Sequence, residues 1–213
     1  MSGERDSAVV LQAASVCLQY PNHRVRADFP LVREALTSID APARTPLLRF
    51  LDVVAGKTET DLARHYVSIF DERRRCCLYL TWWSDGDTRR RGAALAALKA
   101  RFREAGVQLT GTELPDFLPV VLEFAATTDL TGGLALLQEH RPGLELLRLA
   151  LRDAGTPYAE PVAAVCALLP GPSPETVAAA KELARRGPPR EQVGLELTPF
   201  SIAPVTFTQG DRR

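Results

Sequence analysis

The sequence predicts an all-α fold, because apolar residues recur at helical spacing along most of the chain and no βαβ alternation or strand-rich half occurs. The chain has 213 residues, of which 46% are hydrophobic, and this suffices for one domain with a substantial core. We therefore expect a single helical bundle over residues 1–187. Beyond it, prolines and glycines multiply and the helical spacing ends, which predicts an irregular, Pro-rich tail over residues 188–213 that is mobile or lies across the folded body.

Four amphipathic helices are expected before residue 71. Their approximate ranges are 8–20, 28–39, 45–55 and 58–70. Asp28 is the expected N-cap of the second helix, which places Pro30 in its first turn, where a proline lacks no needed N–H group. Thr58 is the expected N-cap of the fourth helix, with Asp61 as its partner three residues later.

The middle of the chain is less regular. Residues 76–83 form an apolar run without alternation, which favours a short buried helix over a strand. Asp87 or Thr88 is expected to cap a long helix that ends near residue 105, and Asp116 is expected to begin the next one. Glycine and proline pairs divide the remainder into shorter helices at about 134–140, 144–154, 158–169 and 174–186.

Composition and motifs exclude several classes of function. With 26 basic and 26 acidic residues the net charge is zero, so neither a nucleic-acid partner nor membrane insertion is expected, and no apolar run approaches the length of a membrane span. The four cysteines form no zinc-binding set and fit a reduced, cytoplasmic protein. No phosphate-binding loop, hydrolase or metalloprotease motif occurs, so we expect neither enzymatic activity nor a resident cofactor.

Aromatic residues and acidic residues gather between positions 66 and 124, which is typical of a binding surface. Because two adjacent helical residues cannot both face the same core, one of Trp82 and Trp83 is expected near the surface, where tryptophan often anchors a protein partner. An apolar groove rimmed by acids would accommodate a basic amphipathic helix.

Several segments of this middle third follow one another in an order and spacing that carry a family resemblance. They are Tyr66-Val67, Phe70-Asp71, Leu78-Tyr79-Leu80-Thr81, Gly86-Asp87-Thr88-Arg89, Glu113-Leu114-Pro115-Asp116 and Leu118-Pro119. In these residues the chain resembles the NarJ family, the assembly chaperones of respiratory nitrate reductase, within the wider TorD/DmsD-like group. One position departs from the pattern, because Phe117 stands where the family usually has a histidine after Leu-Pro-Asp.

The resemblance implies an all-helical chaperone without enzymatic activity. Such a protein binds mainly the N-terminal segment of the apo catalytic subunit of nitrate reductase in the cytoplasm, and keeps it competent to receive its molybdenum cofactor before it docks on the membrane. A second contact site on the same subunit is left open. Two related alternatives are a chaperone that proofreads the signal peptide of another molybdoenzyme, and a carrier of a molybdopterin nucleotide held by arginines such as Arg75 and Arg91. A helical interaction module with an unrelated partner is a third.

We expect the peptide to bind through apolar anchors and acidic selectors. The expected anchors are Tyr66, Phe70, Tyr79, Trp82 and Leu118. The carboxylates expected to select a positive peptide are Asp71, Asp87, Asp116 and Glu123. The competing interpretation assigns three of the anchors, Tyr66, Phe70 and Leu118, to the core, and makes Asp87 and Asp116 helix caps.

Overall fold

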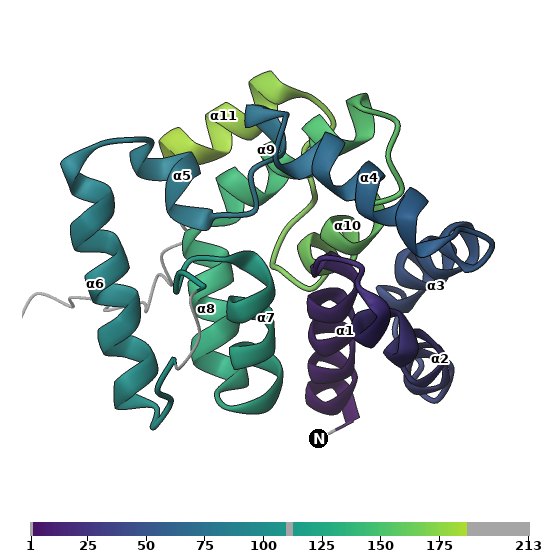
Figure 1. Ribbon diagram of the computed structural model, residues 1–213. Coiled ribbons are helices and arrows are strands. Elements are labelled where there is room, and N and C mark those ends of the chain that lie inside the picture. Colours follow the sequence, from purple (N-terminus) through teal and green to yellow (C-terminus); the bar gives the residue numbers. More distant parts are fainter. Residues whose placement is uncertain (1, 110–112, 187–213) are drawn as a thin grey trace, which may run out of the picture.

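A computed structural model describes residues 2–109 and 113–186 of the chain. Within these ranges the chain forms eleven α-helices, one short 3₁₀ turn and no strand, which confirms the all-α prediction (Figure 1). The tail predicted over residues 188–213 lies outside the described residues.

The elements follow one another along the chain in this order: α1 (Ser2–Leu18), α2 (His23–Thr37), α3 (Arg44–Ala55), α4 (Glu59–Phe70), η1 (Arg74–Cys76), α5 (Leu80–Asp85), α6 (Arg89–Glu104), α7 (Leu118–Thr127), α8 (Leu130–Glu139), α9 (Arg141–Asp153), α10 (Ala159–Ala167) and α11 (Val177–Arg186).

Helix α1 is central to the packing. It lies between α7 on one side and α2 and α3 on the other, and it also contacts α10 (Figure 1). From Val10 to Leu18 only Gln12 and Val16 remain partly exposed, and the fully buried side chains include Leu11 and Ala14. Helix α9 links the other elements, because it packs against α5, η1, α10 and α11.

Two of the predicted helix starts are wrong because a side-chain cap lies earlier than expected. The Oδ1 atom of Asn22 accepts hydrogen bonds from the backbone N–H groups of Arg24 (3.0 Å) and Val25 (3.1 Å), so α2 starts at His23. Asp28 is therefore not the N-cap, and Pro30 lies inside the helix, at an exposed position.

Helix α8 starts before the two glycines that were expected to precede it. Asp129 caps its first turn by accepting a hydrogen bond from the N–H of Gly132 at 2.8 Å. A Cβ atom at Gly133 would lie 2.2 Å from the Cβ of Ala125, so the missing side chain allows α8 to approach α7 closely. In contrast, the predicted cap of α4 is confirmed, since Thr58 Oγ1 accepts from the N–H of Asp61 at 3.2 Å.

The apolar run at residues 76–83 is only partly helical. Residues 77–79 are extended, and Tyr79 pairs with Phe117 in an isolated antiparallel bridge. The N–H of Leu118 donates to the carbonyl of Leu78 at 2.8 Å, and the N–H of Leu80 donates to the carbonyl of Asp116 at 2.9 Å. The prediction of one helix is wrong here because the pairing partner is a single residue of a distant loop, which strand alternation does not reveal.

Candidate functional site

A groove of about 530 Å³ opens where the end of α1, the end of α4 and the start of α7 meet the extended residues 77–79. We call it the acid groove. Its lining residues are Gln19, Tyr20, Asn22, Tyr66, Phe70, Asp71, Cys77, Leu78, Tyr79, Glu113, Phe117, Pro119, Val120 and Glu123.

Three aromatic side chains form one apolar part of this lining. Tyr66 is buried, and its hydroxyl group donates a hydrogen bond to the carbonyl of Leu18 at 3.1 Å. The ring centroid of Tyr66 lies 4.6 Å from that of Phe70 and 5.4 Å from that of Tyr20. Because Tyr20 is 47% exposed, it offers an accessible aromatic surface, and its ring packs against the buried ring of Tyr66.

The bridge between Tyr79 and Phe117 supplies a second apolar part. Their ring centroids are 5.4 Å apart, and the guanidinium of Arg91 lies 5.6 Å from the centroid of the Tyr79 ring. Burial, followed by the nearby carboxylates of Glu113 and Asp116, raises the pKa of Tyr79, so its hydroxyl group stays protonated and can donate. Phe117, at the position where the family pattern has histidine, therefore has a packing role in this protein.

The charged residues of the acid groove are all acidic. Asp71, Glu113 and Glu123 are exposed, and none of them forms an ion pair with another described residue. No lysine, arginine or histidine is among the described residues that line the groove. Three unneutralised carboxylates around an apolar surface produce a local negative potential, although the net charge of the chain is zero.

The structure brings together five of the nine residues expected at the site. Those that line the acid groove are Tyr66, Phe70, Asp71, Tyr79 and Glu123. The other four lie elsewhere: Leu118 is fully buried in the core, Trp82 is partly buried, Asp87 is exposed before α6, and Asp116 is fully buried. The alternative that placed Tyr66 and Phe70 in the core is also partly correct, since both pack against it while they line the groove.

Asp116 holds two segments of the chain together. Its Oδ2 atom accepts hydrogen bonds from the hydroxyl group of Thr81 and, at 3.3 Å, from the backbone N–H of Thr81, and it lies 3.6 Å from Nη2 of Arg91. The carboxylate therefore stabilises the first turn of α5, and the prediction that Asp116 caps the following helix is wrong, because Phe117 is the N-cap of α7. Asp87 is not a cap either, since Thr88 holds the N-cap position of α6.

The contribution of the turn after α1 to the groove is not among the residues expected from the sequence. Gln19, Tyr20 and Asn22 lie in the turn that follows this helix, far in sequence from the other lining residues, which run from Tyr66 to Glu123. The available signal was Tyr20 itself, an aromatic residue beside the helix-stopping Pro21. Among the described residues no group of three or more histidine, cysteine or acidic side chains could hold a metal ion. None of the described helices has the length and apolar character to cross a membrane.

Comparison with known proteins identifies relatives of this chain. Residues 36–164 match the protein family described as the nitrate reductase delta subunit. The chain is 31% identical over 156 residues to the probable nitrate reductase molybdenum cofactor assembly chaperone NarJ of Bacillus subtilis (strain 168), which covers 73% of this chain and 85% of that protein. It is 34% identical over 110 residues to NarJ of Escherichia coli (strain K12), which covers 52% of this chain and 47% of that protein.

Another relative is much longer than the matched region. The nitrate reductase-like protein NarX of Mycobacterium tuberculosis (strain ATCC 25618 / H37Rv) is 45% identical over 158 residues, which are 74% of this chain and only 24% of NarX. The chain thus spans about a quarter of the length of that relative. The family match over residues 36–164 includes the lining residues of the acid groove from Tyr66 to Glu123, and the 31% identity to the Bacillus subtilis protein extends over 156 residues. Together they show that the chain belongs to the nitrate reductase delta subunit family, that of the NarJ proteins.

Proposed function

We propose that this protein is a cytoplasmic maturation chaperone, without enzymatic activity, for the apo catalytic subunit of respiratory nitrate reductase. It binds mainly the N-terminal segment of that subunit and holds the subunit competent for molybdenum cofactor insertion before membrane docking. The relatives named as molybdenum cofactor assembly chaperones support the client class. The observation that carries the binding mode is the acid groove, in which three carboxylates surround aromatic rings and no lining residue among those described is cationic.

The lining suits a short, basic, amphipathic segment. Such a peptide loses about 2–5 kcal/mol in ordering itself on binding, so apolar contacts must offset that loss. Tyr20, Phe70 and Tyr79 offer aromatic surface for the apolar face of the peptide. Asp71, Glu113 and Glu123 then attract its basic side chains, which raises the association rate and excludes acidic segments.

Isothermal titration tests this proposal with a peptide that copies about fifteen N-terminal residues of the host catalytic subunit. The titration is run at about 0.01 M and at about 1 M salt, between which the Debye length falls from roughly 30 Å to 3 Å. We expect saturable binding that weakens at high salt. Absence of binding at both salt concentrations would reject the groove as the site for this segment.

A pair of charge-reversal variants locates the peptide. Asp71→Lys combined with Glu123→Lys reverses two rim charges and is expected to weaken binding by at least about tenfold, or about 1.4 kcal/mol. Asp87→Lys combined with Glu104→Lys is the matched control, because both residues are exposed but lie outside the acid groove. Equal losses in both variants would mean that the peptide responds only to overall charge.

The nucleotide-carrier alternative receives less support from the same geometry. Arg91 pairs with Asp116 and donates to the hydroxyl group of Thr81 at 3.2 Å, so part of its hydrogen-bonding capacity is already used. Arg75 lines a different cavity. A panel of N-terminal peptides from other molybdoenzymes tests the second alternative, a proofreading chaperone for another client, by the order of their affinities. The third alternative, an interaction module with an unrelated partner, requires that no segment of the nitrate reductase subunit binds.

A further inference from the structure

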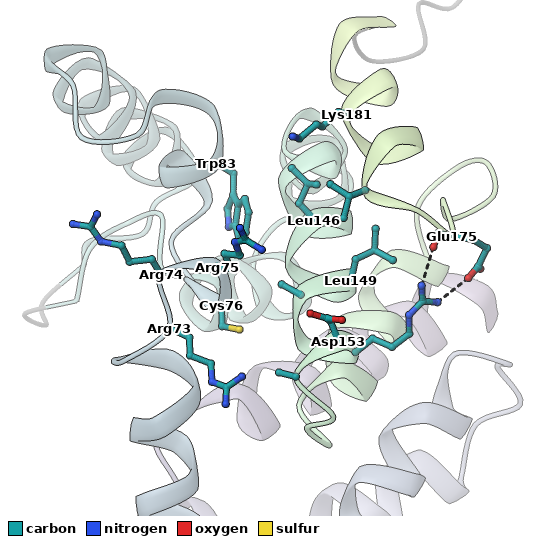
Figure 2. A pocket seen from close by; sticks show the side chains of 14 residues that line it. Arg73, Arg74, Arg75, Cys76, Trp83, Leu146, Leu149, Asp153, Glu175 and Lys181 are labelled. Atoms are coloured by element: carbon teal, nitrogen blue, oxygen red, sulfur yellow. Dashed lines mark hydrogen bonds and ion pairs between the residues drawn. The ribbon is translucent and has the colours of Figure 1, made fainter.

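A second groove, of about 1080 Å³, lies on the other side of the segment that lines the acid groove. We call it the arginine groove. Asp71 and residues 77–79 line the acid groove, whereas residues 73–76 line the arginine groove, so one short segment separates the two. The opposite wall comes from α9 and from the start of α11 (Figure 2).

The charge of this groove is opposite to that of the acid groove. Its lining contains five cationic side chains, Arg73, Arg74, Arg75, Arg152 and Lys181, and two carboxylates, Asp153 and Glu175. Glu175 is already neutralised, because its Oε2 atom lies 2.7 Å from Nη1 of Arg152. The three consecutive arginines are exposed and form no ion pair with any described residue, so their charge is available to a ligand.

The surface between these charges is apolar. Leu146 and Leu149 lie on α9, and Trp83 lies beside Arg75 on the facing wall (Figure 2). The indole N–H of Trp83 donates to the carbonyl of Cys77 at 3.0 Å, so the polar edge of the ring is satisfied and its orientation is held. Val177, at the start of α11, is 50% exposed and extends the apolar surface.

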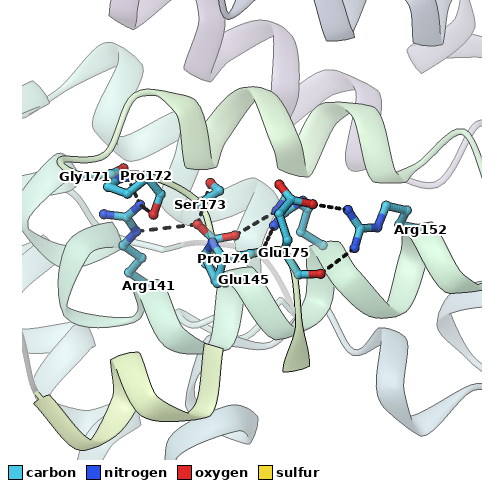
Figure 3. Close-up of polar contacts among 9 residues, drawn as sticks. Arg141, Glu145, Arg152, Gly171, Pro172, Ser173, Pro174 and Glu175 are labelled. Atoms are coloured by element: carbon cyan, nitrogen blue, oxygen red, sulfur yellow. Dashed lines mark hydrogen bonds and ion pairs between the residues drawn. The ribbon is translucent and has the colours of Figure 1, made fainter. Parts of the chain in front are cut away.

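A buried ionic network fixes the wall that α11 contributes. Glu145, on α9, is fully buried, and its Oε2 atom accepts from Nε of Arg148 at 2.7 Å (Figure 3). Its Oε1 atom accepts from the hydroxyl group of Ser173 at 2.7 Å. Arg141 donates to the carbonyl of Gly171 at 2.6 Å, and Arg148 donates to that of Pro174. The segment that leads into α11 is therefore anchored along α9, and the groove exists before any ligand arrives.

We propose that the arginine groove binds an acidic amphipathic segment of a partner polypeptide. The apolar face of that segment packs on Trp83, Leu146 and Val177, while its carboxylates pair with the unneutralised arginines. This site is separate from the acid groove and selects the opposite charge. A chain with both sites can hold two segments of different charge at once, with residues 71–79 between them.

The geometry favours a polypeptide over a small phosphate-containing ligand. A compact phosphate group needs several donors that converge on one point, whereas Arg73 and Arg74 point to different sides of the groove (Figure 2). An extended apolar surface with dispersed cations matches a helix that carries acidic residues along one face.

Fluorescence anisotropy with the full-length protein tests the proposal. The probe is a labelled synthetic helix with leucine at helical spacing on one face and glutamate on the other. We expect saturable binding that Arg73→Glu combined with Arg75→Glu weakens at least about tenfold. The matched control is Arg89→Glu combined with Arg90→Glu, which reverses two exposed arginines outside the groove and is expected to change binding less than about twofold.

Val177→Ser supplies a variant without a charge change, and it is expected to weaken binding because it removes an exposed apolar contact. It also keeps the test decisive if the double charge reversal unfolds the protein, which its melting temperature reports. The basic client peptide is measured on the same variants, and its affinity is expected to stay unchanged, so failure here is distinguishable from failure of the acid groove. Absence of saturable binding, equal losses in the two charge-reversal variants, or displacement of the probe by equimolar pyrophosphate would overturn the proposal.

Discussion

Replacing Asp116 with alanine distinguishes a structural role of this carboxylate from the peptide contact that its position in the sequence suggests. The side chain is fully buried between the Tyr79–Phe117 bridge and α5, and it does not line the acid groove. We therefore expect Asp116→Ala to lower the free energy of unfolding, and we expect the conservative Asp116→Asn to leave peptide binding nearly unchanged.

The magnitude follows from the groups that lose their partner. A hydrogen bond to a charged group contributes about 1.5–3 kcal/mol, and removal of one member of a buried ion pair costs about 3–5 kcal/mol. Arg91 keeps 23% of its side chain exposed, so water can partly hydrate its charge after the substitution. We expect a loss of about 2–4 kcal/mol for Asp116→Ala, and about 1–2 kcal/mol for Asp116→Asn, which retains an oxygen acceptor for Thr81.

Urea unfolding followed by circular dichroism measures the stability, and titration of the basic client peptide measures binding at a temperature where each variant is folded. Asp71→Asn is the matched control, because it also removes one negative charge but on the exposed rim of the acid groove. A loss of stability below about 0.5 kcal/mol for Asp116→Ala, a value usual for surface substitutions, would refute the anchoring role. So would an Asp116→Asn protein of normal stability that fails to bind the peptide.

Two further predictions concern packing and pH. Gly133→Ala is expected to lower the free energy of unfolding, measured in urea, by about 1–3 kcal/mol or more, because its Cβ would lie 2.2 Å from that of Ala125. Gly92→Ala is the control: it has open space around it in α6 and is expected to raise the free energy of unfolding by up to about 1 kcal/mol. A loss of stability in both variants would contradict this reasoning. Burial holds the pKa of His65 and of His140 below the usual value, and nearby cations assist in the case of His65. Below about pH 6.5 the folded protein therefore binds fewer protons than the unfolded chain, and its stability falls as the pH drops. Replacing both histidines with glutamine is expected to flatten the stability profile just below about pH 6.5, and an unchanged slope would show that other groups cause it.

The accuracy of the helix predictions depended on whether the relevant signal was local. Thr58 and Asp61 are three residues apart and form the expected capping contact, so the start of α4 was predictable. Asn22 and Asp129 are caps of the same kind, but a proline or a glycine pair nearby gives a competing local signal. Each of these helices therefore starts earlier in the chain than the sequence predicts. The bridge between Tyr79 and Phe117 was not predictable, because it joins two single residues that are distant in sequence and belong to no strand.

The candidate site also combines features that the sequence predicted with features that depend on packing. Clustering of aromatic and acidic residues predicted that a binding surface lies between residues 66 and 124, and five of the expected residues do line one groove. Burial separated the others: Asp116 and Leu118 are close in sequence to Phe117, yet both side chains are fully buried, while Phe117 lines the groove. The contribution of Tyr20 depends on where α1 ends relative to α4, which is a property of helix packing.

The sequence by itself determined the helical class, most of the helix ranges, the family and the approximate region of the binding surface. These properties follow from the 3.6-residue period, from short-range capping and from residues that are neighbours in the chain. Only the tertiary structure decided which carboxylates surround the acid groove and that Arg73–Arg75 face a second groove instead. The reason is that side-chain exposure depends on contacts between segments distant in sequence, and here Asp71 lines one groove whereas Arg73–Arg75 line the other.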